Sequence, residues 1–240
     1  MPRRLGQHFL NSVLVARKIS IFAGVENESV LEIGAGKGML TQELAKGARC
    51  VYAVEIDPKY AASLRAKQLA NVEVINEDFL KMNLNRYQNL VVVGNIPYSI
   101  TTKILEKLTK MRNCLKRAIL TLQKEFAHKL SAPPGSRNYL YISLVSQMLY
   151  SIEIHDTVPP SAFSPRPRVT SCIVKMQRNL QKPLSHAQLT LLKYIFTDRR
   201  HVLGKVLRRM GYEAPQQLAN KRISDLTIHE ALKLVESLAE

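Results

Sequence analysis

The sequence contains no tryptophan and only three cysteines. Cys50, Cys114 and Cys172 are far apart, and no Cys-x-x-Cys pair occurs. An odd and scattered set argues against a disulfide framework and against a structural zinc site. We therefore expect cysteines that fill apolar space in a reducing compartment, and no metal.

Long apolar runs are also missing. No stretch approaches the roughly 18 apolar residues that are needed to cross a bilayer. Near the N-terminus, the polar residues Gln7, His8, Asn11 and Ser12 interrupt the core of any signal peptide. We expect a cytoplasmic protein with no membrane association.

Acidic residues are scarce relative to basic ones: 19 Asp+Glu against 35 Lys+Arg give a net charge of +16. A domain this basic usually meets a polyanion, although such a surface can also serve solubility alone. The basic residues cluster, which favours nucleic acid, and they do so at Lys103, Lys107, Lys110, Arg112, Lys116 and Arg117, then at Arg199, Arg200, Lys205, Arg208 and Arg209.

From Ser29 to about Met176, short β-rich runs alternate with helical stretches, which is typical of a doubly wound, mostly parallel α/β sheet of the Rossmann-like type. The pattern predicts strands at Val30–Ile33, Val51–Ile56, Val72–Ile75, Leu90–Gly94, Ala118–Leu122, Ile152–Val158 and Cys172–Met176. It predicts helices at Met39–Ala45, Lys59–Ala66, Ile100–Lys110, Lys124–Leu130 and Tyr141–Leu149.

Beyond Gln177, apolar residues recur at helical spacing. A boundary within Arg178–Ser185, which contains Pro183, divides the chain into a cofactor-binding catalytic domain, residues 1–178, and a small all-helical domain, residues 179–240. The second basic cluster, Arg199 to Arg209, falls in the small domain, which we therefore expect to contact nucleic acid.

A glycine-rich loop, Gly34-Ala35-Gly36-Lys37-Gly38, follows the first expected strand. Glycines let the backbone turn tightly and approach a ligand at the start of the next helix. Glu55 ends the second strand, where a carboxylate can accept hydrogen bonds from ribose hydroxyls. The next acidic residue, Asp57, precedes Pro58 and is expected to cap a helix instead.

Two more motifs end the third and fourth strands. Asp78, within Glu77-Asp78-Phe79, is either an acceptor for an adenine amine or only a helix cap. Asn95-Ile96-Pro97-Tyr98 offers two acceptors and a flat ring at the edge where α/β sheets bind ligands. It is either an ordinary strand-exit turn or a site that methylates an exocyclic amine of a planar base.

The glycines, Glu55, Asp78 and Asn95 follow successive strands in order, which argues against coincidence. An NAD-dependent oxidoreductase fits poorly, since the Gly-x-Gly-x-Gly spacing is one residue short of the dinucleotide fingerprint. No proton-transfer residue stands at the fourth strand either. With no phosphate to neutralise and no metal ligands, S-adenosylmethionine fits better than a dinucleotide.

The sequence resembles the KsgA-type ribosomal RNA adenine dimethyltransferases, with the Erm macrolide-resistance methyltransferases as relatives. The similarity spans nearly the whole chain. Besides the motifs above, it is carried by Gly6-Gln7-His8-Phe9-Leu10, Gln123-Lys124-Glu125, Pro134-Gly135-Ser136 with Tyr139, the segment from Val158 to Val169, and Phe196 with Arg199-Arg200.

The resemblance implies S-adenosylmethionine-dependent N6,N6-dimethylation of adenosine in small-subunit ribosomal RNA, by a monomer acting on a precursor particle. It implies catalytic roles for Asn95, Ile96, Tyr98 and Phe163, with Tyr98 and Phe163 on either side of the target base. The cofactor residues it implies are His8, Leu10, Gly34, Gly36, Glu55, Asp78 and Asn95. The RNA-binding residues are Arg199, Arg200, Lys205 and Arg208.

Two positions depart from the family pattern. Ile96 replaces the usual leucine, a change also common in the Erm group, and His201 stands where a lysine normally follows the Arg-Arg pair. An Erm-like enzyme acting on large-subunit RNA therefore stays as an alternative. A non-catalytic RNA-binding assembly factor is a second alternative, although it predicts damage to the cofactor or Asn95 motifs and none is visible. The Gln-Lys-Glu and Pro-Gly-Ser segments favour the KsgA side.

Overall fold

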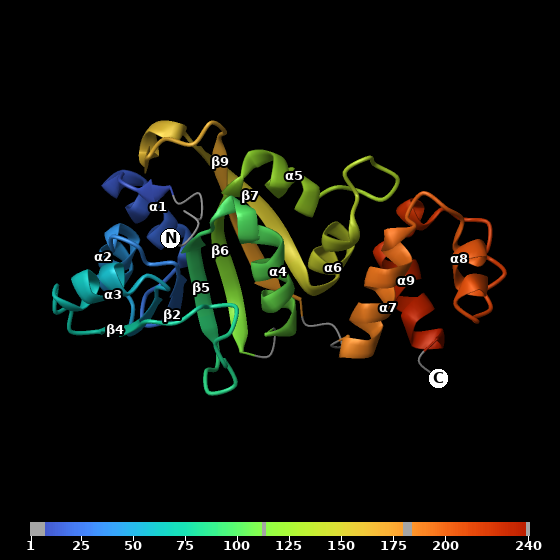
Figure 1. The fold of residues 1–240 in the computed structure, drawn as a ribbon, viewed down its shortest axis with the longest axis horizontal. Helices are drawn as coiled ribbons and strands as arrows, with labels where there is room; N and C mark the ends of the chain where they lie inside the picture. Colours follow the sequence, from blue (N-terminus) through green and yellow to red (C-terminus); the bar gives the residue numbers. More distant parts are fainter. Residues whose placement is uncertain (1–7, 112–113, 180–183, 239–240) are drawn as a thin grey trace. The chain divides into compact units, whose positions relative to one another are not determined.

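The structure, a computed structural model, describes residues 8–111, 114–179 and 184–238 and divides into two compact units (Figure 1). Unit 1 comprises Met1–Ala127 and Ser151–Arg178, and unit 2 comprises His128–Tyr150 and Asn179–Glu240. Gly6, Gln7, Arg112 and Pro183, which the sequence analysis used, lie outside the described residues.

The centre of unit 1 is a seven-stranded sheet in the order β4-β3-β2-β5-β6-β9-β7. Strands β2 to β6 pair in parallel, and β9 is antiparallel to β6. The central strand β5 is a nearly continuous apolar run, and all five residues of β2 are buried, because both faces of the sheet are covered. The bounds are β2 Ser29–Ile33, β3 Cys50–Val54, β4 Val72–Ile75, β5 Leu90–Asn95, β6 Leu115–Gln123, β7 Tyr150–Val158 and β9 Ser171–Arg178.

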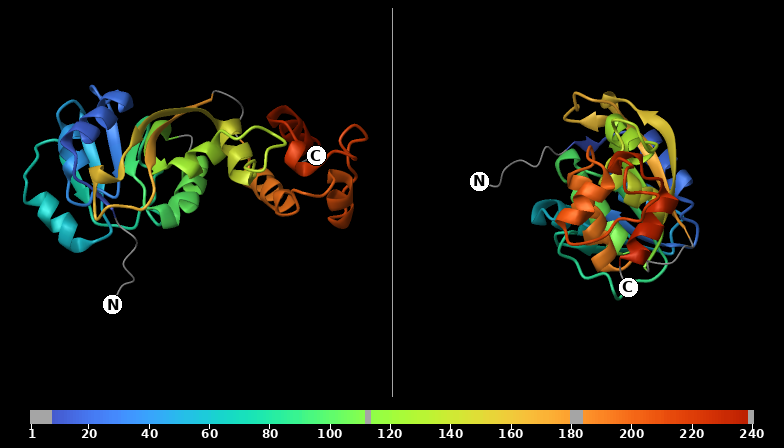
Figure 2. Two further views of the ribbon diagram at one scale, coloured as in Figure 1. Left: turned by 90° about the horizontal axis from the view of Figure 1, so that it is seen from above. Right: turned by 90° about the vertical axis from the view of Figure 1, so that its right-hand side faces the viewer.

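Helices lie on both faces of this sheet, as in a doubly wound fold, with α1 and α4 on opposite sides (Figure 2). Side chains of α1 and α2 form one buried cluster with Val91, Val93 and Ile119 of the sheet. The helices of unit 1 are α1 Val13–Ala23, α2 Met39–Ala45, α3 Pro58–Arg65, α4 Thr101–Lys110 and α5 Lys124–Leu130, which runs into unit 2. The fold class expected from the sequence is confirmed.

Helix α1 was not expected from the sequence, although its ends follow ordinary rules. The Ser12 hydroxyl accepts a hydrogen bond from the Val15 N–H at 3.3 Å and caps the first turn. Gly24, at φ 57°, ends the helix in the left-handed conformation. Only four of the eleven residues are buried, so the apolar pattern of this helix is weak.

A short pair of strands joins the two ends of unit 1. Strand β1, Phe9–Leu10, is antiparallel to β8, Phe163–Ser164, with Leu10 opposite Phe163. The Asn11 N–H donates to the Ala162 carbonyl at 2.9 Å and extends this contact. We call residues 8–10 the strap. A 3-10 turn, Pro160–Ala162, leads into β8.

Unit 2 is helical: α6 Tyr141–Leu149, α7 His186–Thr197, α8 Leu203–Arg209 and α9 Ile228–Ser237, with a 3-10 turn at Ile223–Asp225. Ser185 caps α7 and Thr227 caps α9, each in a capping box.

The division at 178/179 that the sequence suggested is wrong for His128–Tyr150, which belongs to unit 2. Tyr139 is fully buried there, and its hydroxyl donates to the Leu226 carbonyl at 3.0 Å. Helix α6 is apolar on most of its surface and packs with α7 and α9. Sequence periodicity shows that such a segment is buried, but not which partner buries it.

Within the described residues, no helix has both the length and the apolar character that a membrane span requires.

Candidate active site

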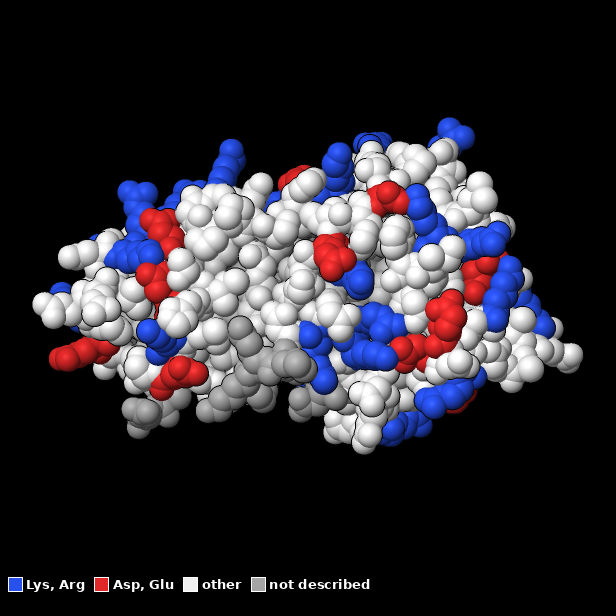
Figure 3. Space-filling view, turned by 180° about the vertical axis from the view of Figure 1, so that it is seen from behind, with Lys and Arg blue, Asp and Glu red and all other residues white. Residues whose placement is uncertain are grey.

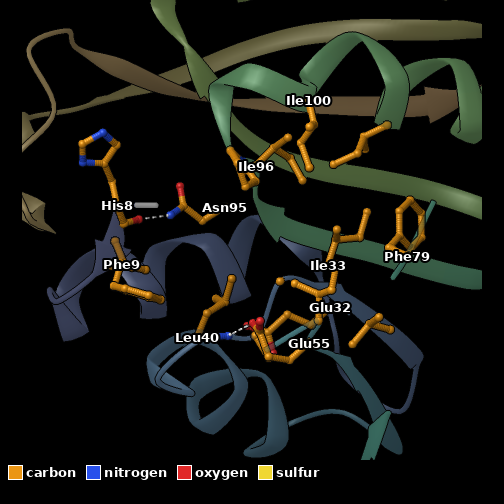
Figure 4. Close-up of a pocket in the computed structure, with 18 of the residues that line it drawn as sticks. His8, Phe9, Glu32, Ile33, Leu40, Glu55, Phe79, Asn95, Ile96 and Ile100 are labelled. Atoms are coloured by element: carbon orange, nitrogen blue, oxygen red, sulfur yellow. Dashed lines mark hydrogen bonds between the residues drawn. The ribbon is translucent and has the colours of Figure 1, made fainter. Parts of the chain in front are cut away.

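A cleft opens at the carboxyl ends of the parallel strands of unit 1 (Figure 4). The strap, the glycine loop and the turns after β3, β4 and β5 line it. Ile96 and Tyr98 are part of this lining. So are all seven residues that the resemblance implied for the cofactor: His8, Leu10, Gly34, Gly36, Glu55, Asp78 and Asn95. The site lies where open α/β sheets bind their ligands.

The glycine loop owes its course to positive φ angles of 73° at Gly34, 53° at Gly36 and 78° at Gly38. Other residues rarely adopt this conformation. A Cβ at Gly36 would lie 2.9 Å from the Phe9 ring, whereas a Cβ at Gly34 would meet nothing within 4 Å. The loop therefore packs closely under the strap at Gly36 and leaves the backbone of Gly34 open to the cleft.

Glu55 is almost fully buried and holds the glycine loop. One carboxylate oxygen accepts from the Gly36 N–H at 2.7 Å, and the other accepts from the Asp57 N–H at 2.9 Å. Each oxygen keeps one further acceptor position for a donor in the cleft. Asp57 itself accepts from the Lys59 N–H at 2.8 Å, so its expected role as a helix cap is confirmed.

Glu32 is a cleft residue that the sequence analysis missed. It is 1% exposed, and Thr41 donates a hydrogen bond of 2.6 Å to its carboxyl group. Burial raises the pKa of Glu32 to about 7, with a further rise from the nearby Glu55; the hydrogen bond from Thr41 opposes the shift. An acidic residue inside the apolar run Val30-Leu31-Glu32-Ile33 was the available signal.

Asp78 caps a turn and also lines the cleft, so its role as acceptor for an adenine amine stays a prediction. One of its oxygens accepts from the Leu80 N–H at 2.9 Å, which caps the local turn. The side chain also lines the cleft beside the buried Phe79. A carboxylate has about four acceptor positions, so the turn leaves capacity for an amine donor.

Asn95 is the last residue of β5, and the strap orients its side chain. The amide nitrogen donates to the His8 carbonyl at 2.7 Å, as the dashed line in Figure 4 shows. The amide oxygen is therefore directed away from His8, and it accepts no hydrogen bond from the described part of the chain.

Tyr98 follows in the turn. Its hydroxyl pairs with that of Ser171 at 2.6 Å, and its ring centroid lies 5.9 Å from that of His8. Burial raises the pKa of Tyr98, and the hydrogen bond with Ser171 opposes this rise. The His8 ring is held in turn by Nδ1, which lies 2.7 Å from the Pro165 carbonyl. His8 of the strap thus contacts both the Asn95 side chain and the Tyr98 ring.

Phe163 does not line the cleft in this structure, so its expected place opposite Tyr98 across the target base stays a prediction. Its side chain is 2% exposed and lies in the buried cluster with Leu10, Val158 and Ile173. Pairing of β8 with β1 turns the ring into the core, and the linear motif around Phe163 does not reveal this pairing.

The expected RNA-binding residues lie in unit 2, apart from the cleft lining. Arg200, Lys205 and Arg208 are exposed on the surface of that unit. Arg199 is only half-exposed, and its guanidinium donates to the Tyr139 carbonyl at 3.0 Å. Three of the four thus present free charge, whereas Arg199 also stabilises the unit.

The first basic cluster is less available than the sequence suggested. Lys107 donates to the carbonyls of Phe79 and Met82, and burial lowers its pKa. Arg117 donates to the Ala23 and Gly24 carbonyls, and Lys116 pairs with Glu28 at 2.6 Å. Lys107 and Arg117 thus serve the fold, whereas Lys103, Lys110 and Lys116 are exposed, and contact of this cluster with RNA stays a prediction.

Four similarities to known proteins agree with this fold and this site. The family profile of ribosomal RNA adenine dimethylase matches residues 2–240. The ribosomal RNA small subunit methyltransferase A of Bacteroides thetaiotaomicron is 35% identical over 98% of this chain and 93% of its own length.

Among solved structures, a dimethyladenosine transferase from Plasmodium falciparum has a TM-score of 0.84 and 26% identity, covering 97% of this chain and 98% of that one. The 23S rRNA methyltransferase ErmE has a TM-score of 0.74 and 28% identity, covering 97% of this chain and 100% of its own.

The sheet order, the cleft and the family match together define a Rossmann-like methyltransferase of the S-adenosylmethionine-dependent class. Within that class, the chain belongs to the ribosomal RNA adenine dimethylase family.

Proposed function

We propose that the chain transfers methyl groups from S-adenosylmethionine to N6 of adenosine in small-subunit ribosomal RNA, giving N6,N6-dimethyladenosine. The orientation of Asn95 carries this proposal: its amide nitrogen is committed to the His8 carbonyl, which leaves the oxygen as an acceptor in the cleft. An exocyclic amine is the donor that such an oxygen suits. The names of relatives such as the Bacteroides enzyme support the choice of substrate.

The cleft residues fit the cofactor. The Gly34 backbone is open, and Glu55 and Asp78 are acidic side chains with acceptor capacity left over. Glu55 would accept from the ribose hydroxyls and Asp78 from the adenine amine. His8 and Leu10 would close the opening through the strap. When bound, S-adenosylmethionine supplies an electrophilic methyl group on a positively charged sulfur.

Asn95 and Ile96 would activate the target. The lone pair of the adenine amine is delocalised into the ring, so this nitrogen is a weak nucleophile. Hydrogen bonds from N6–H to the Asn95 oxygen and the Ile96 carbonyl hold the nitrogen toward tetrahedral geometry and stabilise its growing positive charge. The methylated nitrogen then loses a proton to water. Tyr98 offers its ring as a surface for the base.

RNA binding is supported by the charge of +16 and by the exposed Arg200, Lys205 and Arg208. We further propose that the chain acts as a monomer on a small-subunit precursor particle in the cytoplasm. The three cysteines, all of them free, are compatible with a reducing compartment.

The test incubates purified small-subunit particles, and separately free large-subunit RNA, with the protein and isotopically labelled S-adenosylmethionine. Mass spectrometry of nucleosides should show labelled N6,N6-dimethyladenosine in the small-subunit RNA. Label in the large-subunit RNA alone would favour the Erm-like alternative. Binding of the particle without any label would favour the assembly factor.

A further inference from the structure

Three polar side chains lie together on one face of the sheet, beside the turn that carries Tyr98. Asn95 is the register partner of Thr121 across the parallel pair β5–β6. Thr121 is in turn opposite Ile173, and Ser171 is two residues from Ile173 on the same strand. Register partners and residues two apart share a face of the sheet, so Asn95, Thr121 and Ser171 all point to the same side.

Two of the three have assigned partners. Asn95 donates to the His8 carbonyl at 2.7 Å, and Ser171 pairs with the Tyr98 hydroxyl at 2.6 Å. Thr121 is different: it is 1% exposed, and its hydroxyl has no hydrogen-bond partner within the described residues. Buried polar groups are nearly always paired in native proteins, and an unpaired one destabilises the fold.

The Thr121 hydroxyl and the Asn95 amide oxygen therefore offer hydrogen-bonding capacity side by side, on residues that are partners across β5 and β6. The Asn95 oxygen can only accept, whereas a hydroxyl can also donate. Adenine presents the complementary pair, an amine donor flanked by ring nitrogens that accept.

We propose that Thr121 is a specificity-determining residue whose hydroxyl donates to a ring nitrogen beside the target amine while Asn95 accepts from the amine. This role rests on the proposed function, since it names a second contact for the same base. It also gives the unpaired hydroxyl a partner that arrives with the substrate.

The position of Thr121 adds a requirement for access. Its register partner Ile173 lies in the same buried cluster as Leu10 of β1 and Phe163 of β8. Thr121 does not line the cleft, so the base reaches it only when β8 shifts from this part of the sheet while the His8 carbonyl keeps its hydrogen bond with Asn95. The same shift would expose the Phe163 ring, which is enclosed in this structure.

The test compares Thr121→Val, which keeps the branched shape without the hydroxyl, with Thr121→Ser, which keeps the hydroxyl. Thr109→Val is the matched control, because the Thr109 hydroxyl already donates to the Glu106 carbonyl at 2.8 Å on a different element. Each variant is assayed for methylation of small-subunit particles, for affinity toward S-adenosylhomocysteine and for melting temperature.

We expect Thr121→Val to lower kcat/KM about tenfold, the size of one ordinary hydrogen bond. Its affinity for S-adenosylhomocysteine should stay unchanged and its melting temperature should not fall. Thr121→Ser should restore most of the activity, and Thr109→Val should match wild type in methylation.

A substrate series identifies the contact. Particles are reconstituted with 1-deazaadenosine or 7-deazaadenosine at the target position. One of the two analogues should lower the kcat/KM of the wild type about tenfold and should lower that of Thr121→Val no further. Wild-type efficiency in Thr121→Val, or additive losses with both analogues, overturns the role of Thr121 alone. A wild-type protein that methylates no ribosomal adenosine overturns the proposed function and this role with it.

Discussion

Asn95 has a single amide oxygen to offer a substrate, because its nitrogen is held by the His8 carbonyl. At the scale of one residue, the proposed mechanism therefore depends on that oxygen. A backbone carbonyl, rather than a side chain, orients it, so the choice of residue at position 8 affects Asn95 only through the course of the strap.

Asn95→Ala should lower the single-turnover rate of methylation by about a hundredfold or more, as expected for removal of a prepositioned charge-stabilising group. Affinity for S-adenosylhomocysteine, measured by calorimetry, should change little. Methylation near the wild-type rate in this variant would show that Asn95 is not the acceptor.

Glu32 couples stability to pH. Its pKa is raised to about 7 in the folded chain, from an ordinary value of 4.5, so the folded state holds the proton more tightly than the unfolded state. The protonated Glu32 side chain therefore makes its full contribution to the free energy of unfolding below about pH 4.5, and this contribution is lost as the pH rises through 7. A shift of this size corresponds to about 3 kcal/mol.

Glu32→Gln removes this titration and keeps a group that can pair with Thr41. The stability of the variant relative to wild type should rise by about 3 kcal/mol between pH 4.5 and pH 8. Urea unfolding at both pH values measures it. A difference that is constant with pH would mean that Glu32 titrates normally in the fold.

At the scale of elements, the pair β1–β8 joins residues more than 150 positions apart. It places the strap against the glycine loop and Phe163 in the core. A single two-residue pairing thus supports one wall of the cleft, the orientation of the Asn95 side chain and part of the hydrophobic core.

Phe163→Ala should destabilise the protein by about 3–5 kcal/mol, the usual cost of removing a buried ring. Loss of activity in that variant therefore does not identify a stacking role. Phe163→Leu keeps an apolar side chain without a ring, and slower methylation with an unchanged melting temperature is what stacking on the target base predicts. An unchanged rate would exclude stacking.

At the scale of the whole molecule, charge is the dominant property. Figure 3 shows Lys and Arg side chains spread over the face that it draws, with acidic ones between them. The structure separates these charges into two groups: Lys107 and Arg117 support the fold, whereas Arg200, Lys205 and Arg208 are exposed.

RNA affinity should fall steeply with salt, and a plot of log Kd against log salt concentration should be a straight line with a positive slope. Replacing Arg200, Lys205 and Arg208 together with alanine should reduce that slope by about one for each RNA phosphate that the variant no longer neutralises. Lys46→Ala is the control, because Lys46 pairs with Glu43 on unit 1. An unchanged slope in the triple variant would place the RNA surface elsewhere.

The sequence by itself determined the alternation of strands and helices, the order of Gly34, Glu55, Asp78 and Asn95 and the basic charge. These are local signals: buried strands are apolar runs, and their carboxyl ends meet at one edge. It also identified the Asp57 cap and the class of cofactor.

Only the tertiary structure decided which residues the distant segments bring together. It placed Phe163 in the core, moved residues 128–150 into unit 2 and committed Lys107, Arg117 and Arg199 to backbone carbonyls. It also showed that Thr121 is buried with a hydroxyl that no described residue pairs. Burial and pairing between segments far apart in the chain leave no periodic trace in the sequence, because they depend on which surfaces meet after the local elements have formed.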